Sequence, residues 1–175
     1  MKQRINKMVL SAMFLGIGLV LPLVTGQIKE IGDSLLPMHL PVMLCGLICG
    51  YKYGLFIGAV LPFLRSVTFG MPPIYPNAVW MAAELAAYGF VIGFLYCRLK
   101  QKNLKSVYIS LLSAMVLGRI VWGITKAVLL GFGGKAFTLS MFLVGGFADA
   151  LPGIILQLVL IPLIMTVLNK MKILK

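Results

Sequence analysis

Six long runs of apolar residues dominate the sequence, each followed by a short polar, glycine-rich or proline-rich connection. The run at 77–96 has about 20 residues, which at 1.5 Å per residue span roughly 30 Å, the thickness of a hydrocarbon core. We therefore predict an all-α membrane protein in which residues 1–175 form a single integral membrane domain, a bundle of six transmembrane helices. The predicted helices are 8–25, 37–50, 54–69, 77–96, 106–130 and 139–168.

The connections predict where these helices end. Tyr51-Lys52-Tyr53 is expected to form a tight turn, residues 70–76 carry three prolines, and 131–138 are rich in glycine. The first apolar run follows a basic start, as in a secretory signal peptide. It is longer than a typical signal core and ends at a poor cleavage site, so we expect it to remain as a membrane helix.

Composition and charge agree with a membrane protein and add its orientation. The chain is 61% hydrophobic, with 16 basic and 4 acidic residues and a formal net charge of +12. Most basic residues fall in connections on one side of the predicted bundle, which predicts that this side and both termini lie in the cytoplasm. We expect a multi-pass protein of the cell membrane, and the family resemblance given below implies a bacterial plasma membrane. Because these charges orient the protein and contact anionic lipid, we expect no nucleic-acid partner. The eleven residues on that side are Lys2, Arg4, Lys7, Lys52, Arg98, Lys100, Lys102, Lys105, Lys170, Lys172 and Lys175, against Lys29 and Lys135 on the other.

The predicted helix 77–96 carries polar and aromatic residues on one face. Asn77, Trp80, Glu84 and Tyr88 recur at spacings of three and four, so they lie on the same side of the helix near one end. An ionised glutamate in hydrocarbon costs several kcal/mol unless it is paired or hydrated. Glu84 is therefore predicted to face the interior of the bundle.

Four further charged residues fall inside predicted helices: Arg65, Arg119, Lys126 and Asp149. With Glu84 they are predicted to gather in the outer half of the bundle, while the inner half is almost uncharged. This distribution favours a pocket open to the outside and closed below, whose walls include the aromatic rings of Trp80 and Trp122. The five charges sum to +1, which weakly favours an anionic ligand.

A structural role for these charges is the alternative. Glu84 with Arg119, or Asp149 with Lys126, would then be ion pairs that hold helices together. His39, two residues before Pro41, fits either a donor in the pocket or a solvated loop residue. The residues predicted to bind the substrate, if the charges line a pocket, are His39, Arg65, Asn77, Trp80, Glu84, Tyr88, Arg119, Trp122, Lys126 and Asp149.

Small residues on the first predicted helix indicate a contact surface, and the residues of common metal and nucleotide sites are missing. Ala12 and Gly16 on the first helix form a small-xxx-small pair, which lets a partner subunit approach closely. The glycines at 46, 50, 54 and 58 repeat every four residues, but the predicted turn at 51–53 would divide them. Cys45 and Cys49 lie four residues apart on one predicted apolar helix and Cys97 at the end of another, so we interpret the three cysteines as small apolar packing residues. With one histidine in the chain, we expect no metal and no cofactor. Gly133-Gly134-Lys135 lacks the spacing and hydroxyl of a phosphate-binding loop, so the chain is not expected to be an enzyme or to hydrolyse ATP.

The chain resembles the substrate-binding S components of energy-coupling factor (ECF) vitamin transporters over all six apolar runs. The segments that carry the resemblance are Ala12-x-x-x-Gly16 after a basic start, Gly70-Met71-Pro72-Pro73, Met81-Ala82-Ala83-Glu84-Leu85-Ala86-Ala87-Tyr88-Gly89, and Leu151-Pro152-Gly153 through Gln157 to Pro162.

This resemblance implies a binder for a water-soluble vitamin or precursor, with its site on the outer side, formed by the last three helices and the loop after the first. It also implies docking on a transmembrane coupling subunit that works with two cytoplasmic ATPases, through the small-residue face at Ala12 and Gly16. The usual second alanine of that face is Gly16 here, which weakens the match. Because no histidine lies near the N-terminus, a nickel or cobalt substrate is not expected. The basic residues favour a carboxylate such as pantothenate or nicotinate, with pyridoxine-like or pyrimidine-like ligands as alternatives.

The competing class is a membrane scaffold protein of the rod-shape type, which has a similar six-helix layout and no small ligand. In such a protein the buried charges would satisfy one another and the aromatic residues would only pack. A channel is disfavoured, because polar groups would then line the full thickness of the membrane.

Overall fold

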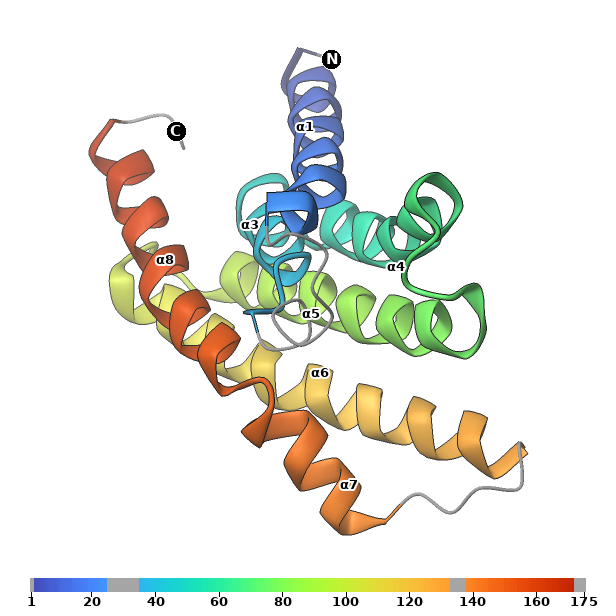
Figure 1. The fold of residues 1–175 in the computed structure, drawn as a ribbon. Coiled ribbons are helices and arrows are strands. Elements are labelled where there is room, and N and C mark those ends of the chain that lie inside the picture. Colours follow the sequence, from blue (N-terminus) through green and yellow to red (C-terminus); the bar gives the residue numbers. More distant parts are fainter. Residues whose placement is uncertain (1, 25–34, 133–137, 172–175) are drawn as a thin grey trace.

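The computed structural model describes residues 2–24, 35–132 and 138–171, which form helices joined by short connections and include no strand. Figure 1 shows the helices in chain order. They are α1 (Lys2–Val24), α3 (His39–Cys49), α4 (Tyr51–Phe69), the turn η1 (Ile74–Ala78), α5 (Val79–Arg98), α6 (Leu104–Phe132), α7 (Leu139–Leu143), the π-helical turn η2 (Val144–Ala148) and α8 (Leu151–Lys170). Lys29, Lys135, Lys172 and Lys175, with the loop after the first helix, lie outside the described residues.

Four helical segments of the described chain are long and apolar enough to cross a membrane: Arg4–Leu23, Ile74–Arg98, Leu104–Gly131 and Leu151–Lys170. This confirms the prediction of an all-α protein with membrane-spanning helices. Helix α4 has 19 residues and α3 has 11. The count of six spans and the cytoplasmic position of the termini stay predictions.

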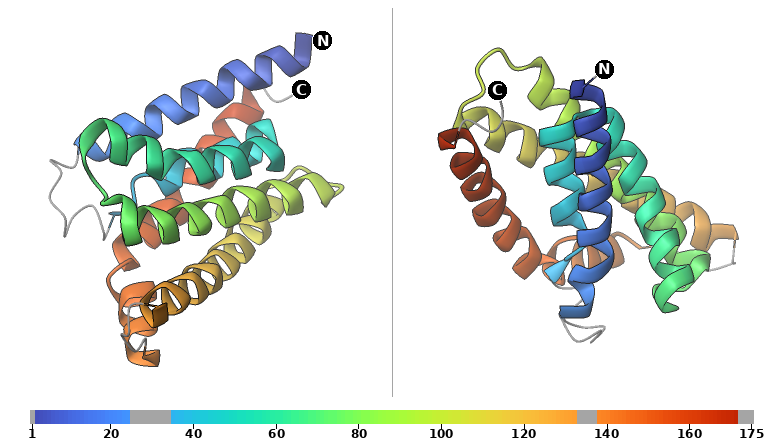
Figure 2. Two further views of the ribbon diagram at one scale, coloured as in Figure 1. Left: turned by 90° about the vertical axis from the view of Figure 1, so that its right-hand side faces the viewer. Right: turned by 90° about the horizontal axis from the view of Figure 1, so that it is seen from above.

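The ends that carry the basic residues lie on one side of the bundle. The start of α1, the end of α8 and the connection from α5 to α6 all lie at the same end in Figure 2, whereas α7 lies at the opposite end. The α5–α6 connection is held by local contacts, because Lys102 donates to the Tyr96 carbonyl and Asn103 Oδ1 accepts from the Ser106 amide at 3.0 Å. Asn103 thereby caps the start of α6.

The predicted turn at Tyr51-Lys52-Tyr53 is wrong. Gly50 alone separates α3 from α4, with a φ of 105° that other residues rarely adopt, and Tyr51 is already the first residue of α4. The Tyr51 ring packs edge-on against Phe90 and Phe94 of α5, with centroids 5.6 and 5.9 Å apart. This packing explains why three residues with turn-like polarity continue a helix.

The predicted single helix 139–168 is also wrong, because this stretch breaks into α7, η2 and α8. Gly145 and Gly146 lie in η2 against the indole of Trp122, and a Cβ on either would lie 3.3–3.4 Å from that ring. The glycine pair therefore lets the backbone approach Trp122 closely. Likewise, the start predicted at Asn77 is replaced by η1, an irregular turn in which Tyr75 is extended, and α5 begins at Val79.

Helix α3 forms the centre of the core, and all but one of its residues are buried. A helix that is apolar on every side is typical of a buried core position or of a membrane span. One cluster joins Met43 and Leu44 of α3 to Tyr88 of α5, and includes Met115 of α6 and Ile161 of α8. A second joins the other side of α3 to α4 and α5, with partly buried residues of α1 against it. Together, α3 and α5 fix where the buried polar residues meet.

Candidate functional site

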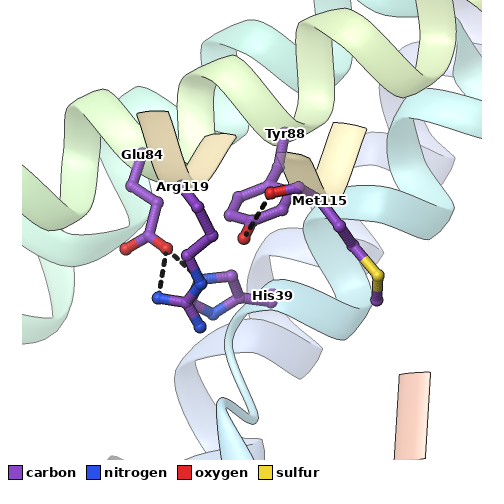
Figure 3. A network of polar contacts seen from close by, with 5 residues as sticks. All are labelled: His39, Glu84, Tyr88, Met115 and Arg119. Atoms are coloured by element: carbon purple, nitrogen blue, oxygen red, sulfur yellow. Dashed lines mark hydrogen bonds and ion pairs between the residues drawn. The ribbon is translucent and has the colours of Figure 1, made fainter. Parts of the chain in front are cut away.

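A cluster of polar side chains lies buried between α3, α5 and α6. Arg119 of α6 donates from Nη1 to Oε1 of Glu84 on α5 at 2.9 Å. His39, the first residue of α3, places Nε2 3.4 Å from the same oxygen. Each of the three is at most 3% exposed, and Figure 3 shows their side chains converging. The pairing of Glu84 with Arg119, one of the two considered from the sequence, is confirmed. We name these three residues the polar cluster.

Tyr88 lines the polar cluster one helical turn after Glu84. Its ring meets His39 edge-on, with centroids 5.1 Å apart, and its hydroxyl donates to the Met115 carbonyl at 3.4 Å. A Cβ on Gly118 would lie 2.8 Å from this ring, so the missing side chain on α6 makes room for it. The neighbours on α6 thus hold Tyr88 beside the ion pair.

The charges of Glu84 and Arg119 balance each other, but several hydrogen-bonding groups of the polar cluster have no partner among the described residues. Arg119 Nε and Nη2 and both ring nitrogens of His39 are buried without a hydrogen-bond partner among the described residues. His39 Nε2 is near enough to Glu84 for an ion pair if it is protonated, although it is not aligned for a hydrogen bond. Buried polar groups nearly always have partners. The unused groups can therefore bond to water, to a ligand or to residues outside the described ranges.

Trp122 and Lys126 extend the site along α6. The Arg119 guanidinium lies 5.9 Å from the Trp122 ring centre, and Lys126 Nζ lies 4.5 Å from the same ring and 5.3 Å from that of Trp80. A cation within about 6 Å of an indole face is attracted by its ring electrons. Aromatic and basic residues predicted to line the site are thus neighbours across α5 and α6.

Three other predicted site residues have surroundings of a different kind. Arg65 is buried, donates from Nη1 to the Leu19 carbonyl of α1 at 2.8 Å, and lies over the Phe69 ring. Asp149 is exposed in the turn before α8, and Asn77 is partly buried in η1. Among the five charges predicted inside the bundle, Glu84 and Arg119 thus form an ion pair, whereas Arg65 bonds to α1 and Asp149 is exposed. The expected open pocket also differs from the structure at the polar cluster, whose residues are covered.

Gln157 is a buried polar residue that was not among the site residues predicted from the sequence. It lies on α8, 2% exposed, and its Nε2 has no hydrogen-bond partner among the described residues. It sits one turn before Ile161, which belongs to the core cluster that contains Tyr88 and Met115. A lone amide in the middle of the apolar run 151–164 was the signal that could have found it.

Ala12 and Gly16 lie on an exposed face of α1. Both are exposed, and nothing lies within 4 Å of a Cβ placed on Gly16. Ile5, Met8 and Met13, on the same helix, are more than half exposed. This face is therefore free to meet lipid or another helix.

A hollow of the structure lies away from the polar cluster, between the start of α6 and the end of α8. Leu104 and Val107 line one side, and Met165, Thr166 and Lys170 line the other. It lies at the end that carries the basic residues, so it is not the predicted outer pocket.

A comparison with protein families decides the affiliation. The sequence model of the family described as ECF transporter, substrate-specific component matches residues 6–165 of the 175. The chain belongs to this family. No curated protein and no solved structure matches it. The match confirms the resemblance drawn from the residues.

As an ECF substrate-specific component, the chain is a substrate-binding subunit that works with an ECF coupling and ATPase module. Family membership and the four long apolar helices make it a membrane protein that takes part in transport. The polar cluster brings charged and hydrogen-bonding side chains together inside a bundle whose buried residues are mostly apolar.

Proposed function

We propose that this subunit captures a water-soluble vitamin or vitamin precursor at the polar cluster and delivers it after docking on a transmembrane coupling subunit. Two cytoplasmic ATPases supply the energy, and the chain itself hydrolyses no ATP. The observation that carries the proposal is the set of buried nitrogens of Arg119 and His39 that have no hydrogen-bond partner among the described residues, next to the carboxylate of Glu84 that balances the charge of Arg119.

These unpartnered nitrogens favour binding over the scaffold alternative. In a scaffold the buried groups would satisfy one another, since a buried donor without an acceptor costs about 1–3 kcal/mol. Glu84 accepts its hydrogen bond from Nη1, one of the three nitrogens of the Arg119 guanidinium. A ligand that bonds to the remaining donors offsets this cost, whereas a purely structural pair leaves it in place.

The position of the polar cluster supports ligand access from the side opposite the basic ends. Glu84 lies in the first half of α5, His39 begins α3, and Arg119 lies in the second half of α6. Those three parts face away from the end where the chain termini lie (Figure 2). With six spans and cytoplasmic termini in a bacterial plasma membrane, ligand would enter from outside the cell, after an opening movement because the residues are buried.

The test of the proposal is ligand release. Protein purified from cells grown in rich medium is denatured, and the released small molecules are identified by mass spectrometry. A vitamin or precursor at about one equivalent per chain supports the binding subunit, since a tight ligand stays bound through purification. If no small molecule is released, and none of the water-soluble vitamins raises the melting temperature of the protein, the scaffold function replaces the proposal.

Docking is tested separately at the exposed face of α1. Ala12→Trp should lower vitamin uptake by cells at least about tenfold, because an indole prevents the close helix approach that small residues permit. Binding by the isolated subunit should not change, since Ala12 is exposed on α1, whereas the polar cluster is buried between α3, α5 and α6.

The control for docking is Val159→Trp, which adds the same ring at an exposed position of α8. It should leave uptake unchanged. Equal loss of uptake in both variants, or loss of binding in Ala12→Trp, would contradict a docking face on α1.

A further inference from the structure

We infer that the ligand presents a planar pair of hydrogen-bond acceptors, above all a carboxylate, to the edge of Arg119 formed by Nε and Nη2. This inference rests on the proposed function and names its substrate class. The sum of five charges along the chain favours an anion only weakly, and one of those charged residues, Arg65, bonds to α1. The atoms of Arg119 give a more specific reason.

The first step is the geometry of the guanidinium. Arginine has five N–H groups in one plane, and those on Nε and one on Nη2 point the same way. Nη1 is engaged by Glu84 at 2.9 Å, while Nε and Nη2 are buried with no hydrogen-bond partner among the described residues. Glu84 thus fixes the plane of the guanidinium and leaves a complete two-donor edge. That edge matches the two oxygens of a carboxylate.

The second step is the balance of donors and acceptors around this edge. The Tyr88 hydroxyl is already directed to the Met115 carbonyl, and Glu84 Oε1 already accepts from Arg119. At the Nε–Nη2 edge of Arg119 both protein groups are donors, and neither has a hydrogen-bond partner among the described residues. The ligand group that meets this edge must therefore supply acceptors.

The same balance excludes other ligand classes. A cationic or amine-bearing ligand would present donors to an edge of Arg119 that itself consists of donors. A ligand with hydroxyl groups alone would fill the edge only in part. The site therefore selects for carboxylates over their amides and alcohols, which have the same skeleton but lack the anionic oxygen pair.

The experiment compares ligand pairs that differ only at this group. The full-length chain, freed of copurified ligand in lipid nanodiscs, is titrated with pantothenate and pantothenol, with nicotinate and nicotinamide, and with thiamine as a cation. We expect one of the acids to bind and its neutral counterpart to bind at least about 100-fold more weakly, since a site built for a group rejects analogues that lack it.

Arg119→Lys tests the two-donor edge itself. Lysine keeps the charge beside Glu84 but cannot present two parallel donors, so binding of the acid should fall at least about 30-fold. The melting temperature without ligand reports whether the variant is folded. The control Arg98→Lys changes an exposed arginine at the end of α5 and should bind as the unchanged protein does.

Several outcomes would overturn the inference. They are equal affinity for an acid and its neutral counterpart, preference for thiamine, full binding by a folded Arg119→Lys, or no binding of either acid. If a ligand without an acceptor pair is released in the denaturation experiment, the proposed function stands and this inference fails. If nothing is released and none of these probes binds, both fail together.

Discussion

Glu84→Gln is expected to destabilise the protein by about 3–5 kcal/mol, the cost of leaving a buried charge without its partner. The carboxylate is the charge that balances Arg119 at 2.9 Å, and both side chains are almost fully buried. Without it the guanidinium is left positive in an apolar interior. The free energy of unfolding, measured by reversible denaturation in detergent and followed by tryptophan fluorescence, checks the effect. Membrane insertion should not change.

A double-mutant cycle separates the ion pair from other effects of the substitution. Arg119→Met removes the charge while keeping most of the side-chain volume, and it should also destabilise the protein. Combining it with Glu84→Gln should give a protein more stable than Glu84→Gln alone, because replacing both charges of a buried pair is often nearly neutral. The control Arg98→Gln, at an exposed position, should cost at most about 0.5 kcal/mol.

Ligand binding distinguishes a binding pair from a structural one. The double variant should recover stability but not binding, since the donors of Arg119 are gone. A double variant that both recovers stability and binds the released ligand normally would contradict the proposed site and assign Glu84 and Arg119 to helix packing alone.

The sequence predicted that charged residues are buried inside the bundle better than it predicted which side chains they contact. Placing Glu84 and Arg119 inside apolar runs predicts burial, because the cost of exposing either to lipid is large. Which cation meets Glu84 depends on how helices cross, and periodicity along one helix does not encode that. Arg65 therefore could not be told from Arg119, although it bonds to α1. His39 stayed undecided because its helix begins at that residue.

Helix boundaries failed where one or two glycines decide the backbone. Gly50 alone breaks the chain between α3 and α4, so the polar residues after it were taken for a longer turn. Gly145 and Gly146 interrupt the last helix beside Trp122, and that contact with α6 is invisible in a one-dimensional pattern. Hydrophobicity predicted where helices lie, whereas tertiary contacts decided where they break.

Gly89→Ala is expected to have the other large effect, preventing stable packing of α4 on α5. A Cβ on Gly89 would lie 2.3 Å from the Gly54 carbonyl oxygen, and one on Gly58 would lie 2.4 Å from that of Leu85. Gly46 of α3 also lies against Gly89, since its Cβ would be 2.5 Å from the Gly89 carbonyl. Three helices therefore meet at backbone distance around one residue.

The cost of this substitution should exceed that of ordinary overpacking, which is about 1–3 kcal/mol. Side chains can rotate away from an added methyl group, but the atoms around Gly89 belong to the backbone of another helix, so α4 and α5 must move apart. Because α5 carries Glu84 and Tyr88, the same movement displaces the polar cluster and should abolish ligand binding. Size-exclusion chromatography and the melting temperature of the purified protein measure the loss.

Gly16→Ala is the matched control for Gly89→Ala, because it adds the same methyl group to a membrane helix where nothing lies within 4 Å. In an open helix position alanine is the better helix former by roughly 1 kcal/mol, so Gly16→Ala should leave stability unchanged or raise it slightly. The contrast between the two variants isolates the close approach of α4 and α5 from any general effect of replacing glycine. If Gly89→Ala has the melting temperature and ligand affinity of the unchanged protein, α4 and α5 can separate at little cost in stability. The polar cluster would then not depend on how closely these two helices pack.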